Sequence, residues 1–284
     1  MWGNIAIAFI LAFIVAFVTT PYTIRIANKI GAVDIPKDKR RMHTQKMPKF
    51  GGPAVILGVL VSVLYLIIVM TIEGSLDLFS TQEYGKKLIG ILLGVVVIFI
   101  TGVLDDVKTL KPWQELLGQT IAAIIVVIFG TKIEHLEIPF LYKIGFNGTF
   151  STIITILWIV GITNAINLID GLDGLSSGIS LISCISLLII FVLNDSPLIA
   201  IVIITAMAGA VTGFLPYNFS PAKTFIGDTG SNFLGFMLAI VSILGVAKTY
   251  TIAVIVLPVI VLGFPIFDVL FAIARRLVKG KSIK

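Results

Sequence analysis

Long apolar runs separated by short polar segments dominate the pattern of residues along this chain. A helix needs roughly 20 mostly apolar residues to cross a bilayer, and its backbone groups must all be bonded internally. The runs therefore predict transmembrane helices. We expect nine of them, at residues 3–26, 51–71, 86–104, 114–130, 151–168, 176–193, 197–216, 231–247 and 251–277. The last run contains Pro258 and Pro265 and is expected to be a broken helix.

The composition agrees with this pattern. Hydrophobic residues make up 57% of the 284 positions and charged residues only 13%, whereas a soluble domain carries about a quarter charged residues. We therefore predict an all-α polytopic membrane protein with a single domain over residues 1–284. One polar segment, 132–146, alternates polar and apolar residues around Pro139 and predicts a small β-hairpin on the outer surface. The single cysteine, Cys184, lies in an apolar run and is expected to be buried packing.

Basic residues predict the orientation of the chain, because cytoplasmic loops carry an excess of lysine and arginine. Of the 21 such residues, 16 lie on the side that contains the loop 25–49 and the C-terminus, and five lie on the other side. This distribution predicts a cytoplasmic first loop and an N-terminus outside. The same orientation places Asp105, Asp106, Asp170, Asp173 and Asp228 at the cytoplasmic ends of spans.

Asp105 and Asp106 end the third predicted span, and ionisable residues inside spans are functional candidates because they are costly there. Neighbouring residues on a helix point about 100° apart. We therefore expect two separate tasks, one carboxylate acting as a base or charge partner and the other anchoring a neighbour. A solvated helix end is the structural alternative.

Asn164, Asn167 and Asp170 recur every three residues at the end of the fifth span and form one polar stripe. Such a stripe is expected to face a wet cavity or another helix. Hydrogen bonding between helices is the alternative explanation, above all for Asn164. The sequence Gly171-Leu172-Asp173-Gly174 then breaks the helix.

A glycine-rich segment, Phe225-Ile226-Gly227-Asp228-Thr229-Gly230-Ser231-Asn232, stands directly before the next predicted span. Its glycines permit tight turns, and the first N–H groups of the following helix are expected to bind phosphate oxygens. Asp228 is a candidate ligand for a hard cation such as Mg²⁺. The segment is not a Walker A motif, because the lysine and the spacing of that motif are absent.

The first cytoplasmic loop is basic and then carries a proline and glycine frame. It reads VDIPKDKRRMH and continues to PKFGG at the next span. The lysines alone are explained by membrane orientation or by anionic lipid headgroups. The frame of Pro48, Gly51 and Gly52 indicates a shaped loop.

These motifs together resemble the polyprenyl-phosphate N-acetylhexosamine-1-phosphate transferase family, which includes the phospho-MurNAc-pentapeptide translocase. The matching stretches are VDIPKDKRRMH with PKFGG, GVLDD, NAINLIDGLDGL, FIGDTGSNFLG and PIFDVLFAIARR, in family order from about residue 20 to 280. The resemblance implies transfer of a sugar phosphate from a UDP-sugar to undecaprenyl phosphate, with release of UMP. It implies Mg²⁺ as the cofactor, with Mn²⁺ as an alternative, and a bacterial inner membrane with the active site on the cytoplasmic face.

The resemblance also implies roles for individual residues. Catalytic roles fall on Asp105, Asp106 and Asp228, and metal binding on Asn167 and Asp228. Substrate binding falls on His43, Arg40, Arg41, Lys111, Asn164, Asp170, Asp173, Gly227 and Thr229. Whether Asp105 is a true base stays open.

Within the family, the first loop and the NAINLIDGLDGL stretch are closer to the UDP-GlcNAc enzymes that begin teichoic acid or O-antigen synthesis. The pentapeptide-sugar branch usually reads TMGG where this chain reads KFGG. A histidine-rich motif usually follows the paired arginines, but histidine occurs here only at His43 and His135. We therefore expect a domain that lacks the family's histidine loop and final span. Members of the family have ten or more spans, whereas nine are predicted here.

Two alternatives stay open at this point: the pentapeptide-sugar transferase, and a non-catalytic protein that binds or transports lipid phosphate. We expect the membrane, the UDP-sugar and the polyprenyl phosphate as partners, and no nucleic acid. A homodimer is compatible with the sequence but is not indicated by it.

Overall fold

A computed structural model describes residues 2–34, 46–74, 82–137, 143–246 and 275. The described chain is nearly all helical. The eight helices are α1 Trp2–Ile30, α2 Gly52–Ile72, α3 Gln82–Lys108, α4 Pro112–Ile128, α5 Gly148–Leu168, α6 Leu175–Leu193, α7 Leu198–Asn218 and α8 Gly227–Val246. The four short strands are β1 Val33–Asp34, β2 Met47–Pro48, β3 His135–Glu137 and β4 Lys143–Gly145.

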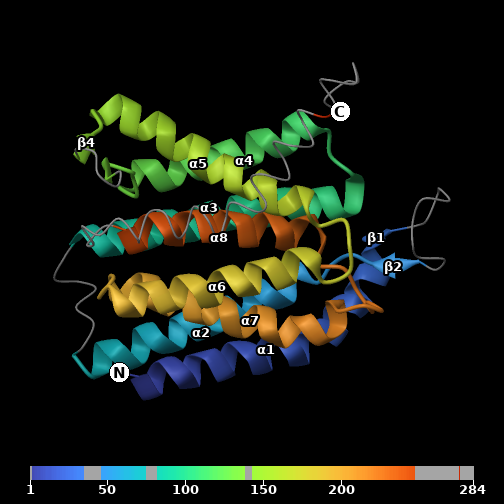
Figure 1. Ribbon diagram of the computed structural model, residues 1–284. Coiled ribbons are helices and arrows are strands. Elements are labelled where there is room, and N and C mark those ends of the chain that lie inside the picture. Colours follow the sequence, from blue (N-terminus) through green and yellow to red (C-terminus); the bar gives the residue numbers. More distant parts are fainter. Residues whose placement is uncertain (1, 35–45, 75–81, 138–142, 247–274, 276–284) are drawn as a thin grey trace.

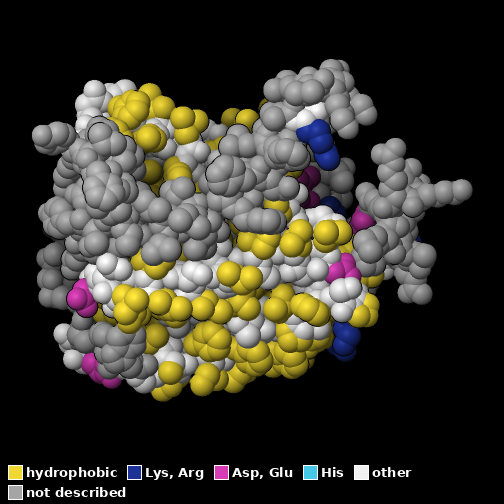
Figure 2. All heavy atoms as spheres, in the orientation of Figure 1, with side chains coloured by type: hydrophobic (Ala, Val, Ile, Leu, Met, Phe, Trp, Pro, Cys, Tyr) yellow, Lys and Arg dark blue, Asp and Glu magenta, His cyan; other side chains and the backbone are white. Residues whose placement is uncertain are grey.

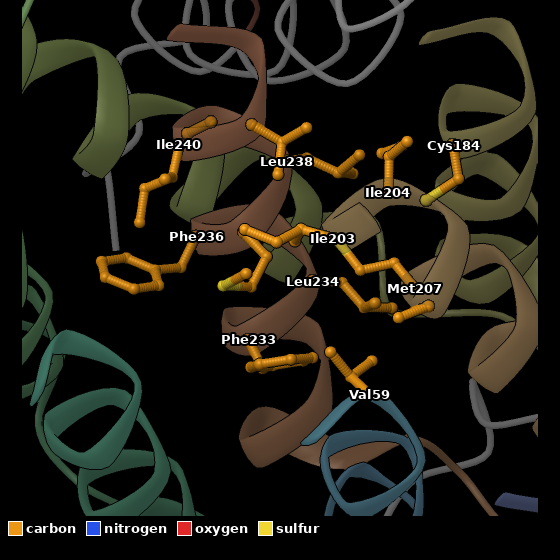
Figure 3. Close-up of a cluster of buried hydrophobic side chains, with 14 of the residues drawn as sticks. Val59, Cys184, Ile203, Ile204, Met207, Phe233, Leu234, Phe236, Leu238 and Ile240 are labelled. Atoms are coloured by element: carbon orange, nitrogen blue, oxygen red, sulfur yellow. The ribbon is translucent and has the colours of Figure 1, made fainter. Parts of the chain in front are cut away.

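The helices form a bundle in which α7 and α8 are the most buried elements (Figure 1). Helix α8 packs against α3 and α5, while α7 packs against α1, α2 and α6. Phe233 and Phe236 of α8 are fully buried, as are Ile203 and Met207 of α7, and Figure 3 shows these side chains between the helices. The interior of the bundle is therefore centred on the helix that begins with Gly227.

Small residues let α1 lie close to α7. Ala8, Ala12 and Ala16 of α1 are fully buried, and a Cβ added at Gly209 or Gly213 of α7 would collide with carbonyl groups of α1. Close backbone approach of this kind is typical of helices packed in membranes.

On the face seen in Figure 2, hydrophobic side chains run along the bundle and the charged side chains lie toward its two ends. Of the described helices, seven are long and apolar enough to cross a membrane, and α4, with 17 residues, is shorter. The prediction of a polytopic helical fold is confirmed. The number of spans stays a prediction, because the ninth predicted span, 251–277, lies outside the described residues except for Arg275.

Several predicted boundaries were wrong at one end of the bundle. Helix α3 continues past residue 104 to Lys108, so that Asp105 and Asp106 lie within the helix. Helix α8 begins at Gly227 rather than at residue 231. The glycine-rich segment therefore forms the first turn of α8 and not a loop before it, because the left-handed Gly227 (φ +74°) lets the chain turn directly into the helix.

The predicted hairpin is confirmed by β3 and β4, which pair antiparallel with His135 opposite Gly145. The structure adds a second, shorter pair that the sequence did not predict. Strand β1 pairs with β2, with Val33 opposite Pro48, and so joins the two ends of the first loop. Figure 1 shows this pair at one end of the bundle.

Candidate metal centre at one end of the bundle

Four elements bring polar side chains together at the β1–β2 end of the bundle: the last turns of α3 and α5, the first turns of α4, and the start of α8. A glycine permits the closest of these approaches. A Cβ at Gly102 of α3 would collide with the backbone of Thr229 in α8. The next turn of α3, which carries Asp105 and Asp106, therefore lies against the first turn of α8.

The segment that leads into α2 runs alongside the segment that leads into α8. The Phe225 N–H donates to the Pro48 carbonyl at 2.8 Å, and the Gly52 N–H donates to the Ile226 carbonyl at 2.8 Å. A Cβ on Gly52 would collide with the backbone at Gly230. The PKFGG frame is thus a backbone contact surface for the start of α8, and it places Lys49 there.

Asp106 is buried, with 2% of its surface exposed, and binds the start of α8. One carboxylate oxygen accepts from the Asp228 N–H at 2.9 Å, and the other accepts from the Thr229 N–H at 3.0 Å and from the Thr229 hydroxyl at 2.5 Å. The Lys49 Nζ lies 3.7 Å from Asp106 Oδ1. Two of the helix N–H groups that we expected to bind a phosphate, those of Asp228 and Thr229, therefore donate to a carboxylate of the protein itself.

Asp105 points to a different group of acids. Its carboxylate, that of Asp228 and that of Glu115 in the first turn of α4 each place an oxygen within 4.8 Å of the others. Asp105 also accepts from the Leu110 N–H, at 2.5 Å, across the α3–α4 turn. The two neighbouring aspartates therefore do different things, as the helical spacing predicts.

Asp228 contacts side chains from α5 and from the segment that precedes α2. Its Oδ1 accepts from Asn167 Nδ2 at 3.0 Å, and its Oδ2 lies 3.4 Å from Lys49 Nζ. Asn167 also donates to the Ser231 hydroxyl at 3.2 Å. The Asn167 amide thus faces Asp228 as a donor and ties α5 to the first turns of α8.

A buried amide network lies behind Glu115. Glu115 Oε1 accepts from Gln119 Nε2 at 3.2 Å and from Asn232 Nδ2 at 3.1 Å, and Gln119 also donates to Asn232 Oδ1 at 2.9 Å. Asn164 donates to Gln119 and to the Val160 carbonyl. The Asn164–Gln119 bond joins α5 to α4 and is the interhelical hydrogen bonding that was the alternative explanation for Asn164.

Asp170 and Asp173 lie in the turn between α5 and α6 and brace neighbouring segments. Asp170 accepts from the Ser176 hydroxyl, and Asp173 Oδ2 accepts from the Ala222 N–H at 3.0 Å. Removal from water raises the pKa of Asp170 to about 7, although the Ser176 hydroxyl opposes that shift. Both residues hold the loops around the carboxylates rather than joining the group of three.

The structure thus brings together one part of the predicted site. Asp105, Asp106, Asn167, Gly227, Asp228 and Thr229 lie at the α3–α8 contact. Lys111 is exposed at the N-cap of α4. Arg40, Arg41 and His43 lie outside the described residues.

Sequence reasoning missed Lys49 and Glu115. Lys49 belongs to a loop whose basic residues were explained by membrane orientation, and only its place beside the Gly51-Gly52 frame marked it. Glu115 carried a signal that we did not use: it is the one acidic residue in the first turn of an apolar helix that follows Asp105 and Asp106 by a short turn.

The donor chemistry of this group fits a hard divalent cation. Such ions prefer carboxylate and amide oxygens, and three carboxylates this close together repel one another unless positive charge lies between them. Lys49 is the one lysine or arginine that forms an ion pair with them among the described residues. The cluster of Asp105, Glu115 and Asp228 could therefore hold a metal ion.

An apolar helical bundle with an acidic cluster at one end defines a multi-pass membrane protein with a candidate metal centre at one end of its helices. Comparison with known proteins shows the family of this chain. Residues 88–246 match the model of the glycosyl transferase family 4, and the chain belongs to that family.

The "Probable undecaprenyl-phosphate N-acetylglucosaminyl 1-phosphate transferase" of Bacillus subtilis is 40% identical over 283 residues, which are 99% of this chain and 74% of that protein. The decaprenyl-phosphate N-acetylglucosaminephosphotransferase of Mycobacterium tuberculosis is 39% identical over 92 residues, 28% of this chain and 23% of that protein. The phospho-N-acetylmuramoyl-pentapeptide-transferase of Chlamydia trachomatis is 45% identical over 60 residues, 20% of this chain and 18% of that protein. The predicted resemblance to polyprenyl-phosphate sugar-phosphate transferases is confirmed, and the chain is a phosphoglycosyltransferase by family.

Proposed function

We propose that this protein transfers N-acetylglucosamine 1-phosphate from UDP-N-acetylglucosamine to undecaprenyl phosphate, releases UMP, and depends on Mg²⁺. The observation that carries the proposal is the cluster of Asp105, Glu115 and Asp228 beside Lys49 at one end of an apolar bundle. The near full-length similarity to the Bacillus subtilis protein supports the choice of acceptor and sugar. The product would be the first lipid-linked intermediate of a cell-envelope glycan.

The proposed reaction is a displacement at phosphorus. An oxygen of the lipid phosphate attacks the phosphorus that carries the sugar, the bond from that phosphorus to the bridging oxygen of UMP breaks, and UMP leaves with the bond electrons. A Mg²⁺ ion, when bound, would supply positive charge against the negative charge that develops on the phosphate oxygens. Asp105, Glu115 and Asp228 would hold it.

The protein's own residues supply the remaining functions. The Lys49 ammonium, 3.4 Å from Asp228 Oδ2, places a positive charge where a diphosphate would approach the cluster. Asp105 is the carboxylate that would accept a proton from the lipid phosphate, if that phosphate arrives protonated. Asn167 holds Asp228 in place from α5.

We further propose that this end of the bundle faces the cytoplasm and that the N-terminus lies outside. The distribution of lysine and arginine, 16 against five, supports this orientation. It also agrees with the supply of nucleotide sugars inside the cell.

One assay tests the function. Purified protein is mixed with undecaprenyl phosphate, UDP-N-acetylglucosamine and Mg²⁺, and UMP release is followed over time. We expect turnover that EDTA abolishes and that Asp228→Ala lowers by more than about 100-fold, because the cluster loses one of its three carboxylates and loss of even an outer partner of a ligand costs about 10- to 100-fold. Absence of UMP from the wild-type protein with an intact fold would instead favour a lipid-phosphate binding protein.

Replacement of the donor tests the sugar. UDP-N-acetylmuramoyl-pentapeptide is supplied in place of UDP-N-acetylglucosamine at the same concentration. We expect UMP release to fall to background, and faster release with the pentapeptide donor would show that the sugar assignment is wrong.

A further inference from the structure

Asp106 and Asp105 are neighbours, yet only Asp105 has an oxygen near Glu115 and Asp228. Asp106 is 2% exposed, and both of its oxygens accept hydrogen bonds from the first turn of α8. Because hydrogen bonds from α8 already occupy both oxygens, Asp106 is poorly suited to contact a substrate phosphate, which is itself negatively charged.

The start of α8 needs such a partner. The first N–H groups of a helix have no acceptor within the helix, and a side chain at the N-cap commonly supplies one. The residue before α8 is Ile226, which has no polar side-chain atom. Asp106 supplies the missing acceptor from α3, and the absence of a side chain at Gly227 leaves room for its carboxylate.

The same contact sets the position of Asp228. The Asp228 N–H is itself one of the donors to Asp106, at 2.9 Å. A shift of Asp106 therefore moves the backbone on which the Asp228 carboxylate stands. The Thr229 hydroxyl donates to Asp106 Oδ2 at 2.5 Å, so that the Asp106 carboxylate is held at both of its oxygens.

We propose that Asp106 is a positioning residue, which caps α8 together with Thr229 and so fixes Asp228 within the cluster of Asp105, Glu115 and Asp228, and that it does not contact the substrate. The inference rests on the proposed function, because it takes that cluster to be the metal centre. It assigns different roles to two adjacent aspartates: Asp105 acts at the reacting groups and Asp106 acts through Asp228.

The sharpest test changes Thr229 and leaves both aspartates intact. Thr229→Val removes the hydroxyl donor and keeps the shape of the side chain, whereas Thr229→Ser keeps the hydroxyl. Thr212→Val is the matched control, because the Thr212 hydroxyl donates only to the Ala208 carbonyl of its own helix. Mn²⁺ is the metal probe, and its free concentration is measured by electron paramagnetic resonance with each purified full-length variant.

We expect Thr229→Val to weaken Mn²⁺ binding by about tenfold, in the range usual for loss of a group that orients a metal ligand. The concentration of Mg²⁺ that gives half-maximal UMP release should rise in parallel, while kcat at saturating Mg²⁺ stays within about twofold. Thr229→Ser and Thr212→Val should bind Mn²⁺ as the wild type does. A general loss of stability would not separate metal affinity from kcat in this way.

Asp106→Asn gives the second measurement. An asparagine keeps one acceptor oxygen, so it can accept from Asp228 or from Thr229 but not from both, and we expect a larger loss of Mn²⁺ affinity than in Thr229→Val. The inference is overturned if Asp106→Asn binds Mn²⁺ as the wild type does but lowers kcat at saturating Mg²⁺ by 100-fold or more, because Asp106 then acts in the chemistry. It is also overturned if Thr229→Val and Thr229→Ser bind Mn²⁺ equally.

These outcomes are separable from failure of the proposed function. A wild-type protein that binds Mn²⁺ but releases no UMP would overturn the reaction while the Mn²⁺ series still tests the role of Asp106. A wild-type protein that binds no Mn²⁺ would overturn the metal centre and this inference together.

Discussion

Glu115→Gln is the change that most directly tests whether the acidic cluster is built for a cation. Both hydrogen bonds to Glu115, from Gln119 and Asn232, end on the same oxygen, Oε1. A glutamine keeps that acceptor oxygen and the shape of the side chain. The substitution therefore removes one negative charge and leaves the surrounding amide network in place.

The size of the effect follows from the distances in the cluster. The three carboxylates place oxygens within 4.8 Å of one another, and two unit charges at that separation repel by roughly 1 kcal/mol in water and by roughly 3 kcal/mol at an effective dielectric constant of 20. Because the Asp228 side chain is 31% exposed, the smaller figure applies. Glu115 takes part in two such pairs, so we expect the metal-free variant to be about 2 kcal/mol more stable than the metal-free wild type.

With metal present the sign reverses. Loss of one of three carboxylate ligands should weaken Mn²⁺ binding by at least about tenfold, since loss of even an outer partner of a ligand costs about 10- to 100-fold. The thermal midpoint is measured in EDTA and in excess Mg²⁺, and Mn²⁺ affinity is measured separately. Glu115→Gln should raise the midpoint in EDTA and shrink the increase that Mg²⁺ produces.

Glu134→Gln is the control, because it makes the same chemical change at an exposed residue next to the hairpin at the other end of the bundle. It should leave both midpoints and Mn²⁺ affinity unchanged. If Glu115→Gln lowers the midpoint in EDTA, or binds Mn²⁺ as the wild type does, the reasoning from charge repulsion is refuted and Glu115 is not a ligand.

Three further changes test the frame around the cluster. Gly227→Ala should lower the thermal midpoint strongly, because Gly227 has φ +74° and a Cβ would meet the Asp106 carboxylate; Gly161→Ala, where a Cβ meets nothing within 4 Å, should change little. Asp170→Asn should raise the midpoint in EDTA more at pH 8 than at pH 5, because folding raises the pKa of Asp170 to about 7 and the folded state loses stability as pH rises from about 4 toward 7. Cys184→Ala should leave UMP release within about twofold, because Cys184 is fully buried in the hydrophobic core and distant in the chain from every site residue.

The fold was predictable from the sequence because membrane spans follow from hydropathy over a local window. The pairing of β3 with β4 was predictable for the same reason, since alternation is also a local pattern. The separate orientations of Asp105 and Asp106 followed from helical geometry alone. Each of these inferences needs only residues that are near one another in the chain.

The membership of the site was harder to predict because it depends on contacts between distant segments. Lys49 reaches Asp228 only because the Gly51-Gly52 frame lies against the chain at Phe225, 174 residues further on. Glu115 joins the cluster only because α4 turns back along α3. A local pattern cannot show the approach of Lys49, whereas the short turn between Asp106 and α4 was a local signal for Glu115.

The start of α8 shows most clearly where pattern reasoning stops. A glycine-rich helix start is a site for an anion, and the sequence alone leads to a substrate phosphate. In the structure the anion is the Asp106 carboxylate, supplied from 122 residues away. The rule that a helix start attracts an anion therefore holds, but here two of its N–H groups bind a carboxylate of the protein, so that the start of α8 helps to hold the backbone of Asp228 in place.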